Sequence, residues 1–256
     1  MVRLIWNEMT RNELAAALPG AVVVVPTGAT EQHGPHLVTG HDSFTVAAIA
    51  GEAASAATAT VVQAPTLMFG SSQHHLAFGG TLSLSTETYY RVVRDLVQSM
   101  IAGGARRIFL LNGHGGNQEL NQLVARDVAL EQAQDSGVSI AAASYWQIAA
   151  ASLSAEYGGS GMPLPGHAGA FETSTMLASQ PQHVREPRAV RDQDPFPGEV
   201  IAGVRVESAG SWQVFDGYTD FPHRATAEQG QRSLDLIIHD VAAAFDALAA
   251  LSPSAR

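Results

Sequence analysis

The stretch Ala21-Val-Val-Val-Val-Pro-Thr-Gly28-Ala-Thr-Glu31-Gln-His33 decides the fold of this 256-residue chain. Its first half is a run of β-branched residues without the apolar–polar alternation of a half-exposed strand. Such a run is typical of a parallel strand that is buried on both faces. Its second half brings a carboxylate and an imidazole directly after the strand, so the stretch also begins a candidate site.

Strand and helix patterns alternate along the rest of the chain. Further strands are predicted at residues 60–64, 107–111 and 138–143, and helices at residues 43–57, 86–102, 117–135, about 169–178 and 226–251. Residues 181–222, which are rich in proline, glycine and aspartate, are expected to be irregular or to form short hairpins. The alternation predicts the α/β class, with one three-layer α/β/α domain over residues 1–256 and a mainly parallel central sheet.

Composition excludes several classes of partner. The formal net charge is −10, so a nucleic acid or an anionic membrane is an unfavourable partner. The chain has no cysteine, no stretch of signal-peptide length near Met1 and no long apolar segment, which is compatible with a cytoplasmic protein. Charged residues make up only 15% of the chain, and we expect part of its surface to be buried between subunits.

Two polar motifs follow two of the predicted strands. Glu31 and His33 come after the strand at residues 21–26, and Asn112-Gly-His114-Gly-Gly-Asn117 comes after the strand at residues 107–111. In open parallel sheets, ligands gather at the carboxyl ends of the strands. The sequence therefore places both motifs at the same edge of one sheet.

Five side chains in three glycine-flanked stretches are candidate metal ligands. They are Glu31, His33, Asp42, His114 and Glu172. Carboxylates and imidazoles together suit zinc, manganese or a similar divalent ion. Five donors exceed what one tetrahedral site needs, and they are about right for two ions that share a carboxylate and activate water for hydrolysis.

Asp42, Glu172 and the loop around His114 also have simpler interpretations. Asp42 is placed to cap the helix that follows it, and Glu172 falls in the first turns of a helix, where a carboxylate is favourable for dipole reasons alone. The glycines around His114 could form a phosphate-binding loop, although the lysine of a P-loop is missing. A structural metal in an inert protein is a further alternative, although structural sites are usually closed.

A second group of residues is expected to contact the substrate or move protons. His167 is the candidate general acid or base. His36, His74, Gly115, Gly116 and Trp146 are candidate substrate-binding residues, and residues 145 and 153–165 are candidate pocket residues, the latter as a loop. Adjacent residues rarely face one centre, so His74 and His75 are not both expected at the site, and His41 is given no role.

The motifs together resemble the creatininase (creatinine amidohydrolase) family. The resemblance rests on Gly28-Ala-Thr-Glu-Gln-His-Gly-Pro-His-Leu37, Asn112-Gly-His-Gly-Gly-Asn117 and His167-Ala-Gly-x-x-Glu-Thr-Ser174, with support from Phe78-Gly-Gly-Thr-Leu-Ser-Leu84 and Ala225-Thr-Ala-Glu-x-Gly230, and it spans residues 20 to 240. It implies a three-layer fold, two divalent ions per subunit (zinc and/or manganese, with iron possible) and a homohexamer. By resemblance, Glu31, Asp42 and His114 hold one ion, His33, Asp42 and a glutamate hold the other, and His167 is catalytic.

One position departs from the family pattern. Creatininases carry a metal-binding glutamate two residues after the histidine of the second motif, where this chain has Gly116, and Glu172 is the natural substitute. The sequence thus predicts a binuclear amidohydrolase that cleaves a small or cyclic, creatinine-like amide through a metal-bridged hydroxide. The alternatives are a formamide deformylase or a peptidase of the same family, or a non-enzymatic anion-binding protein.

Overall fold

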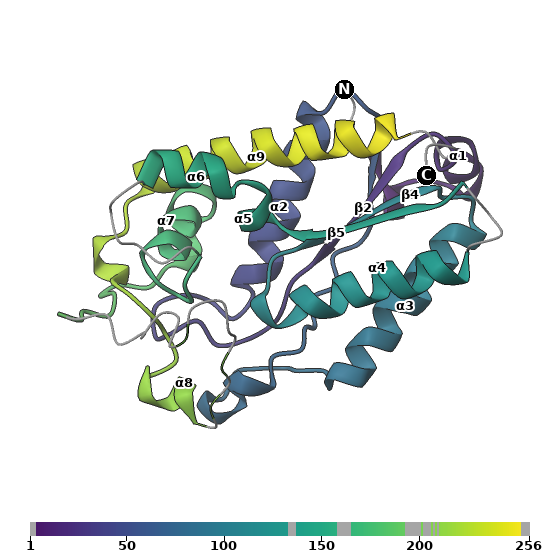
Figure 1. Ribbon diagram of the computed structural model, residues 1–256. Helices are drawn as coiled ribbons and strands as arrows, with labels where there is room; N and C mark the ends of the chain where they lie inside the picture. Colours follow the sequence, from purple (N-terminus) through teal and green to yellow (C-terminus); the bar gives the residue numbers. More distant parts are fainter. Residues whose placement is uncertain are drawn as a thin grey trace.

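A sheet of parallel strands lies at the centre of the molecule (Figure 1). The computed structural model describes residues 4–132, 137–157, 165–192, 201, 206, 208 and 210–251. Within these residues the strand order is β1-β3-β2-β4-β5, and every pair is parallel. The strands are β1 (Leu4–Ile5), β2 (Val22–Thr27), β3 (Val61–Gln63), β4 (Arg107–Asn112) and β5 (Ser139–Ser144). The predicted α/β class with a mainly parallel sheet is confirmed.

Helices cover both faces of the sheet (Figure 1). One face carries α2 (His41–Ala56), α5 (Tyr145–Ile148), α6 (Ala150–Tyr157), α7 (Ala170–Ser179) and α9 (Ala227–Ala250). The other face carries α1 (Arg11–Ala17), α3 (Thr86–Ala102) and α4 (Gln118–Glu131). The short helix α8 (Ser211–Val214) lies away from the sheet (Figure 1). Short 3₁₀ turns occupy Trp6–Glu8, Gln73–Phe78, Gly115–Asn117, Pro181–His183 and Pro222–Arg224.

The valine run of β2 explains the three layers. All of its residues are buried, and successive side chains point to opposite faces of the sheet. Val22 and Val24 join the apolar cluster formed with α2 and α9, whereas Val23 and Val25 join the cluster formed with α3 and α4. The unbroken β-branched run is therefore the signature of a strand between two cores.

Most element boundaries agree with the sequence patterns to within one or two residues, and the exceptions are short. The patterns did not predict β1, α1, α5, α6 or α8, and the last of these lies within residues 181–222, for which no helix was expected. The prediction of a loop over residues 153–165 is wrong at its start, because α6 continues to Tyr157, while residues 158–164 lie outside the described part. Residues 133–135, at the end of the helix predicted over 117–135, also lie outside the described part.

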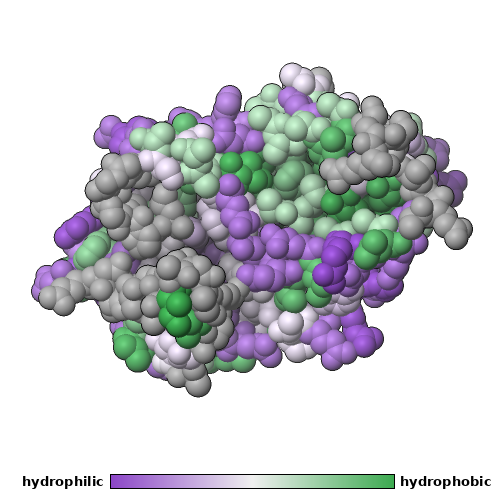
Figure 2. Space-filling model, in the orientation of Figure 1, coloured by the Kyte–Doolittle hydropathy of each residue, from purple (hydrophilic) through white to green (hydrophobic). Residues whose placement is uncertain are grey.

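The edge strand β5 is less covered than β2, β3 and β4. Its residues are half-buried apart from the last, and apolar side chains gather over it beside the polar residues of α4 (Figure 2). Among the described helices, none is long and apolar enough to cross a membrane.

Candidate metal centre

The carboxyl ends of β2 and β4 bring the first two motifs together. Thr27 and Asn112, the last residues of these strands, pair with each other. The Asn112 side chain donates to the carbonyl of His114 and accepts from its backbone N–H. Asn117 links the same loop to Gly28 and Ser71. The two asparagines therefore hold the loop through bonds between their side chains and the backbone.

The predicted ligands Glu31, Asp42 and His114 converge. The Nδ1 atom of His114 lies 3.2 Å from Glu31 Oε1 and 3.2 Å from Asp42 Oδ2. The three residues come from the loop after β2, from the first turn of α2 and from the loop after β4. All of them are at least 96% buried.

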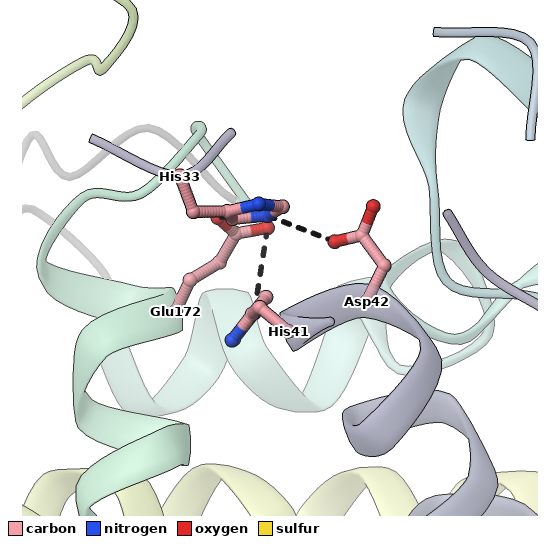
Figure 3. Close-up of side chains that lie close together, drawn as sticks. All are labelled: His33, His41, Asp42 and Glu172. Atoms are coloured by element: carbon pink, nitrogen blue, oxygen red, sulfur yellow. Dashed lines mark ion pairs between the residues drawn. The ribbon is translucent and has the colours of Figure 1, made fainter. Parts of the chain in front are cut away.

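A second group forms beside the first and shares Asp42. The Nε2 atom of His33 lies 2.9 Å from Asp42 Oδ1 and 3.8 Å from Glu172 Oε2, as Figure 3 shows. The two oxygens of Asp42 thus face different imidazoles. A carboxylate in this position can bridge two cations.

Hydrogen bonds fix which ring nitrogen of each histidine faces the carboxylates. His33 Nδ1 lies 3.2 Å from the carbonyl of Glu31, and His114 Nε2 lies 3.2 Å from the carbonyl of Ser71. A carbonyl only accepts, so in each ring this nitrogen carries the hydrogen. The opposite nitrogen then offers its lone pair, which is the usual arrangement of a histidine that binds a metal.

The simpler interpretation is wrong for Asp42, whereas Glu172 does have a local structural role. Asp42 is not the cap of α2, because the residue at that position is Gly40 and no side-chain cap bond is present there. Glu172 does have a local role, since Oε2 accepts from the backbone N–H of Ala168 at 2.5 Å. The same oxygen lies 3.8 Å from His33 Nε2, and Oε1 lies 3.9 Å from His41 Nε2, so this local role and a ligand role are compatible.

His167 reaches the same centre from the loop before α7. Gln32 organises this side, because its Nε2 donates to the carbonyl of Gly217 and to His75 Nδ1. Both hydrogens of the amide are then used, and His167 Nε2 donates to the backbone carbonyl of Gln32 at 3.0 Å. The bare Nδ1 of His167 therefore faces the site, 3.7 Å from Glu31 Oε1.

A cavity of about 810 Å³ opens onto this cluster. Of the predicted substrate-binding residues, His74, Gly115, Gly116 and Trp146 line it. His36 does not; it is buried and bonds to the hydroxyl of Thr173, so it holds its loop against α7.

Burial and charge divide the histidines of the cluster into two kinds. Burial favours the neutral ring of His33, but Asp42 and Glu172 outweigh it and raise its pKa to about 10. The carboxylates of Glu31 and Asp42 likewise raise the pKa of His114 well above its usual value. Burial lowers the pKa of His41 and of His75 to about 3, and that of His167 well below its usual value. The protein thus concentrates positive charge where the two carboxylate groups meet.

The pKa values of the two carboxyl groups beside His33 shift in opposite directions. Burial works against ionisation of Asp42, but the charge of His33 and hydrogen bonds from His114 and His33 hold its pKa well below the usual range. Burial raises the pKa of Glu172 to about 8.

These residues fit divalent cations better than any anion. Several buried polar atoms have no hydrogen-bond partner within the described residues: Glu31 Oε2, both nitrogens of His41 and Nε2 of His75. The Nε2 atoms of His41 and His75 lie 3.9 and 3.7 Å from Glu172 and Glu31. Carboxylates and imidazoles gathered in this way suit zinc or manganese. Glu31 and Asp42 beside the glycine loop would repel a phosphate, which argues against the anion-binding alternative.

Sequence reasoning missed four residues of the site. His75 lies 3.7 Å from Glu31, and His74 also reaches Glu31, because the 3₁₀ turn Gln73–Phe78 directs both rings inward. The expectation that the two would not share a centre was therefore wrong. Trp212 packs against His74, His75 and His167 from α8, far along the chain. His41 and Gln32 are the other two; both lie next to predicted ligands in the sequence, which was the only available signal.

Comparisons with known proteins agree with this geometry. A family model described as creatininase, creatinine amidohydrolase, matches residues 7–245. A mycofactocin precursor peptide peptidase of Mycolicibacterium smegmatis is 31% identical over 87% of this chain and 83% of its own length. A creatinine amidohydrolase of Pseudomonas putida is 32% identical over 73% of this chain and 74% of its own length.

Solved structures give the same result. A crystal structure of creatinine amidohydrolase superposes with a TM-score of 0.81 at 26% identity, covering 98% of this chain and all of the other. A creatininase described with Mn matches with a TM-score of 0.79 and a mutant of Zn–Zn type with 0.78, each 26% identical and covering 95% of this chain and 97% of theirs.

Proposed function

The chain belongs to the creatininase family of hydrolases that act on C–N bonds, and we propose that it is a binuclear metal-dependent amidohydrolase whose substrate is a small or cyclic amide. One set of ligands is Glu31, Asp42 and His114, and the other is His33, Asp42 and Glu172. The ions are zinc and/or manganese, as named for two structural relatives, with iron as a further possibility.

The position of Asp42 supports this proposal most directly. Its Oδ1 faces His33 and its Oδ2 faces His114, so one buried carboxylate serves two sets of donors. Bound there, two divalent cations supply Lewis acidity toward a carbonyl oxygen and lower the pKa of a nearby water.

His167 is the proposed proton carrier. Its Nδ1 has a free lone pair at the wall of the cavity, and the bond from Nε2 to the carbonyl of Gln32 fixes the ring. The imidazole accepts a proton on Nδ1 and returns it to the nitrogen that leaves the substrate. Trp212 packs on the outer side of the ring and shields it from water.

Metal removal tests the proposal. We expect hydrolysis of at least one amide in a panel of creatinine, other cyclic amides, formamides and short peptides to stop after dialysis against a chelator. Stepwise addition of Zn²⁺ or Mn²⁺ should restore it, with metal content measured in parallel. His114→Ala should lower metal content and turnover together. Activity that survives complete metal removal would contradict the proposal.

A peptidase is the second candidate, and two observations favour it. The mycofactocin precursor peptidase aligns over more of this chain than the creatinine amidohydrolase does, and the cavity of about 810 Å³ is at the upper end for a small-molecule site. Cleavage of the peptides in the panel, with creatinine untouched, would select this candidate.

We further propose that the chain acts as one domain in the cytoplasm and forms a homo-oligomer, a hexamer by resemblance, without nucleic-acid or membrane partners. The half-buried apolar edge strand β5 supports self-association, because an unpaired strand edge is readily covered by a second copy. Sedimentation velocity measures the assembly directly, and a monomer at micromolar concentration would argue against it.

A further inference from the structure

His41 is a buried imidazole that the proposed function does not use. It is the first residue of α2, and its side chain is fully buried. Neither of its ring nitrogens has a hydrogen-bond partner within the described residues. Burying such a group without a partner costs free energy, so a site that uses it is expected.

The ring of His41 faces the second group of donors. Its Nε2 lies 3.9 Å from Glu172 Oε1, as Figure 3 shows. One donor atom each from His33, His41, Asp42 and Glu172 lies within 4.8 Å of all the others. Two imidazoles and two carboxylates are a complete donor set for one tetrahedral zinc ion.

The distances suit ligands of an ion better than hydrogen bonds. A separation of 3.9 Å is too long for a direct bond between His41 and Glu172, which needs roughly 3.2 Å or less. Donors placed about 2.0–2.2 Å from a tetrahedral ion are about 3.3–3.6 Å from one another. The contacts His33–Asp42, His33–Glu172 and His41–Glu172 measure 2.9, 3.8 and 3.9 Å and lie on either side of that range, and no pair in the group exceeds 4.8 Å.

The two groups also differ in access to the cavity. Glu31, Asp42, His114 and Glu172 line it, whereas His33 and His41 do not. All three protein donors of the first group therefore lie on the open side, whereas the two imidazoles of the second group lie away from it. Catalytic zinc sites keep an open position, and sites with four protein ligands are closed.

We propose that His41 is the fourth protein ligand of the second ion, together with His33, Asp42 and Glu172. This inference rests on the proposed binuclear function and gives the two ions different roles. The second ion is held in a closed site and retained tightly, and the first ion keeps an open position toward the cavity.

Zinc binding by the full chain tests the proposal without an activity assay. The metal-free protein is titrated with Zn²⁺ against a competing chelator, and zinc or cobalt(II) samples are studied by X-ray absorption and visible spectroscopy. His41→Ala should lower the binding affinity for one of the two ions by more than about 100-fold. Loss of a residue that only hydrogen-bonds to a ligand lowers metal affinity by about 100-fold at most. The coordination shell should lose one imidazole.

His41→Gln and His239→Ala make the result specific. A glutamine side chain is able to donate a hydrogen bond to Glu172 but brings no imidazole, so we expect the second ion to stay weakly bound in this variant. If glutamine restores the affinity, His41 only positions Glu172, and the assignment is wrong. His239 is exposed on α9, and its loss should change neither ion. Should His41→Ala fail to fold, as judged by circular dichroism of the metal-free protein, the glutamine variant decides.

Two negative outcomes are distinguishable. If His41→Ala keeps both ions with wild-type affinity and an unchanged spectrum, His41 is not a ligand, and the binuclear proposal stands. If the wild-type protein binds no zinc or manganese, the proposed function fails before His41 is considered.

Discussion

Gly116 shows how tightly one residue can constrain the second motif. A Cβ atom at this position would lie 2.2 Å from the carbonyl oxygen of Ser71 and 2.6 Å from His114 Nε2. The position therefore has no room for the glutamate that creatininases carry, whereas Glu172 reaches the centre from α7.

Gly116→Ala is expected to destabilise the protein by about 1–3 kcal/mol, as overpacking does, and to weaken metal binding by displacing His114. The matched control is Gly115→Ala, where a Cβ would meet nothing within 4 Å. Urea denaturation and metal content measure both effects. Equal stability of the two variants would contradict the packing argument.

His167→Ala tests the role of a single proton carrier. We expect turnover to fall by roughly 10²–10⁴-fold, the usual contribution of a positioned acid or base, while both ions remain bound. His167→Gln keeps the bond to the carbonyl of Gln32 but cannot carry a proton, and it should be equally slow. Loss of metal in either variant would make His167 a ligand instead.

At the residue scale, the sequence could identify those metal-ligand candidates whose neighbours in the sequence indicate their position in the fold. Glu31, His33 and His114 follow strands and are flanked by glycines, so strand order alone brings them together. Trp212 could not be found in this way, because α8 reaches His75 only through the folded chain. His41 differs again: its position was obvious, but its lack of polar partners is a property of the packed interior.

At the element scale, α7 and α9 approach closely at one glycine. A Cβ at Gly230 would lie 1.8 Å from the carbonyl oxygen of Ser174. Helix propensity favours alanine over glycine by about 1 kcal/mol, but this contact reverses the sign. Helix α7 carries Glu172 in its first turn, so the spacing of the two helices also sets the position of this donor.

Gly230→Ala is therefore expected to destabilise the protein by about 1–3 kcal/mol or more and to lower metal affinity through Glu172. Gln231→Ala, at the next and exposed position of α9, is the control and should be close to neutral. Chemical denaturation of both variants with and without zinc separates the two effects. A stabilising Gly230→Ala would mean that the two helices can move apart freely.

Periodicity predicted the long elements because each has one consistent burial pattern. Buried residues recur at Tyr89, Val93, Val97 and Met100 along α3, and Ser85 caps its start. The short elements β1, α5 and α6 carry too few residues for a period to be visible, and their positions follow from packing on the sheet and on α9.

At the scale of the whole molecule, the fold places the side chains of the proposed metal ligands close together even without a cation. The metal-free protein must hold these groups together by protonation. His33 has a pKa raised to about 10, so between its ordinary value near 6.5 and pH 10 only the folded state holds this proton. The pKa of His114 is also raised, so its contribution has the same sign. The pKa of Glu172 is raised to about 8, so between pH 4.5 and 8 this carboxyl group too holds its proton only in the folded state. The histidines with lowered pKa values exchange protons below about 6.5 and do not contribute above neutrality.

Because the folded state binds more protons across this window, the free energy of unfolding of the metal-free protein should fall as pH rises from 7 to 9. Bound cations displace these protons, so the metal-loaded protein should show a much smaller slope and should release protons on binding. Urea denaturation at several pH values, with and without Zn²⁺, measures the slopes. His33→Gln removes one of the groups that titrate in this window and should make the metal-free slope smaller. A metal-free protein that gains stability from pH 7 to 9 would mean that its imidazoles are neutral and that charge does not hold the empty cluster together.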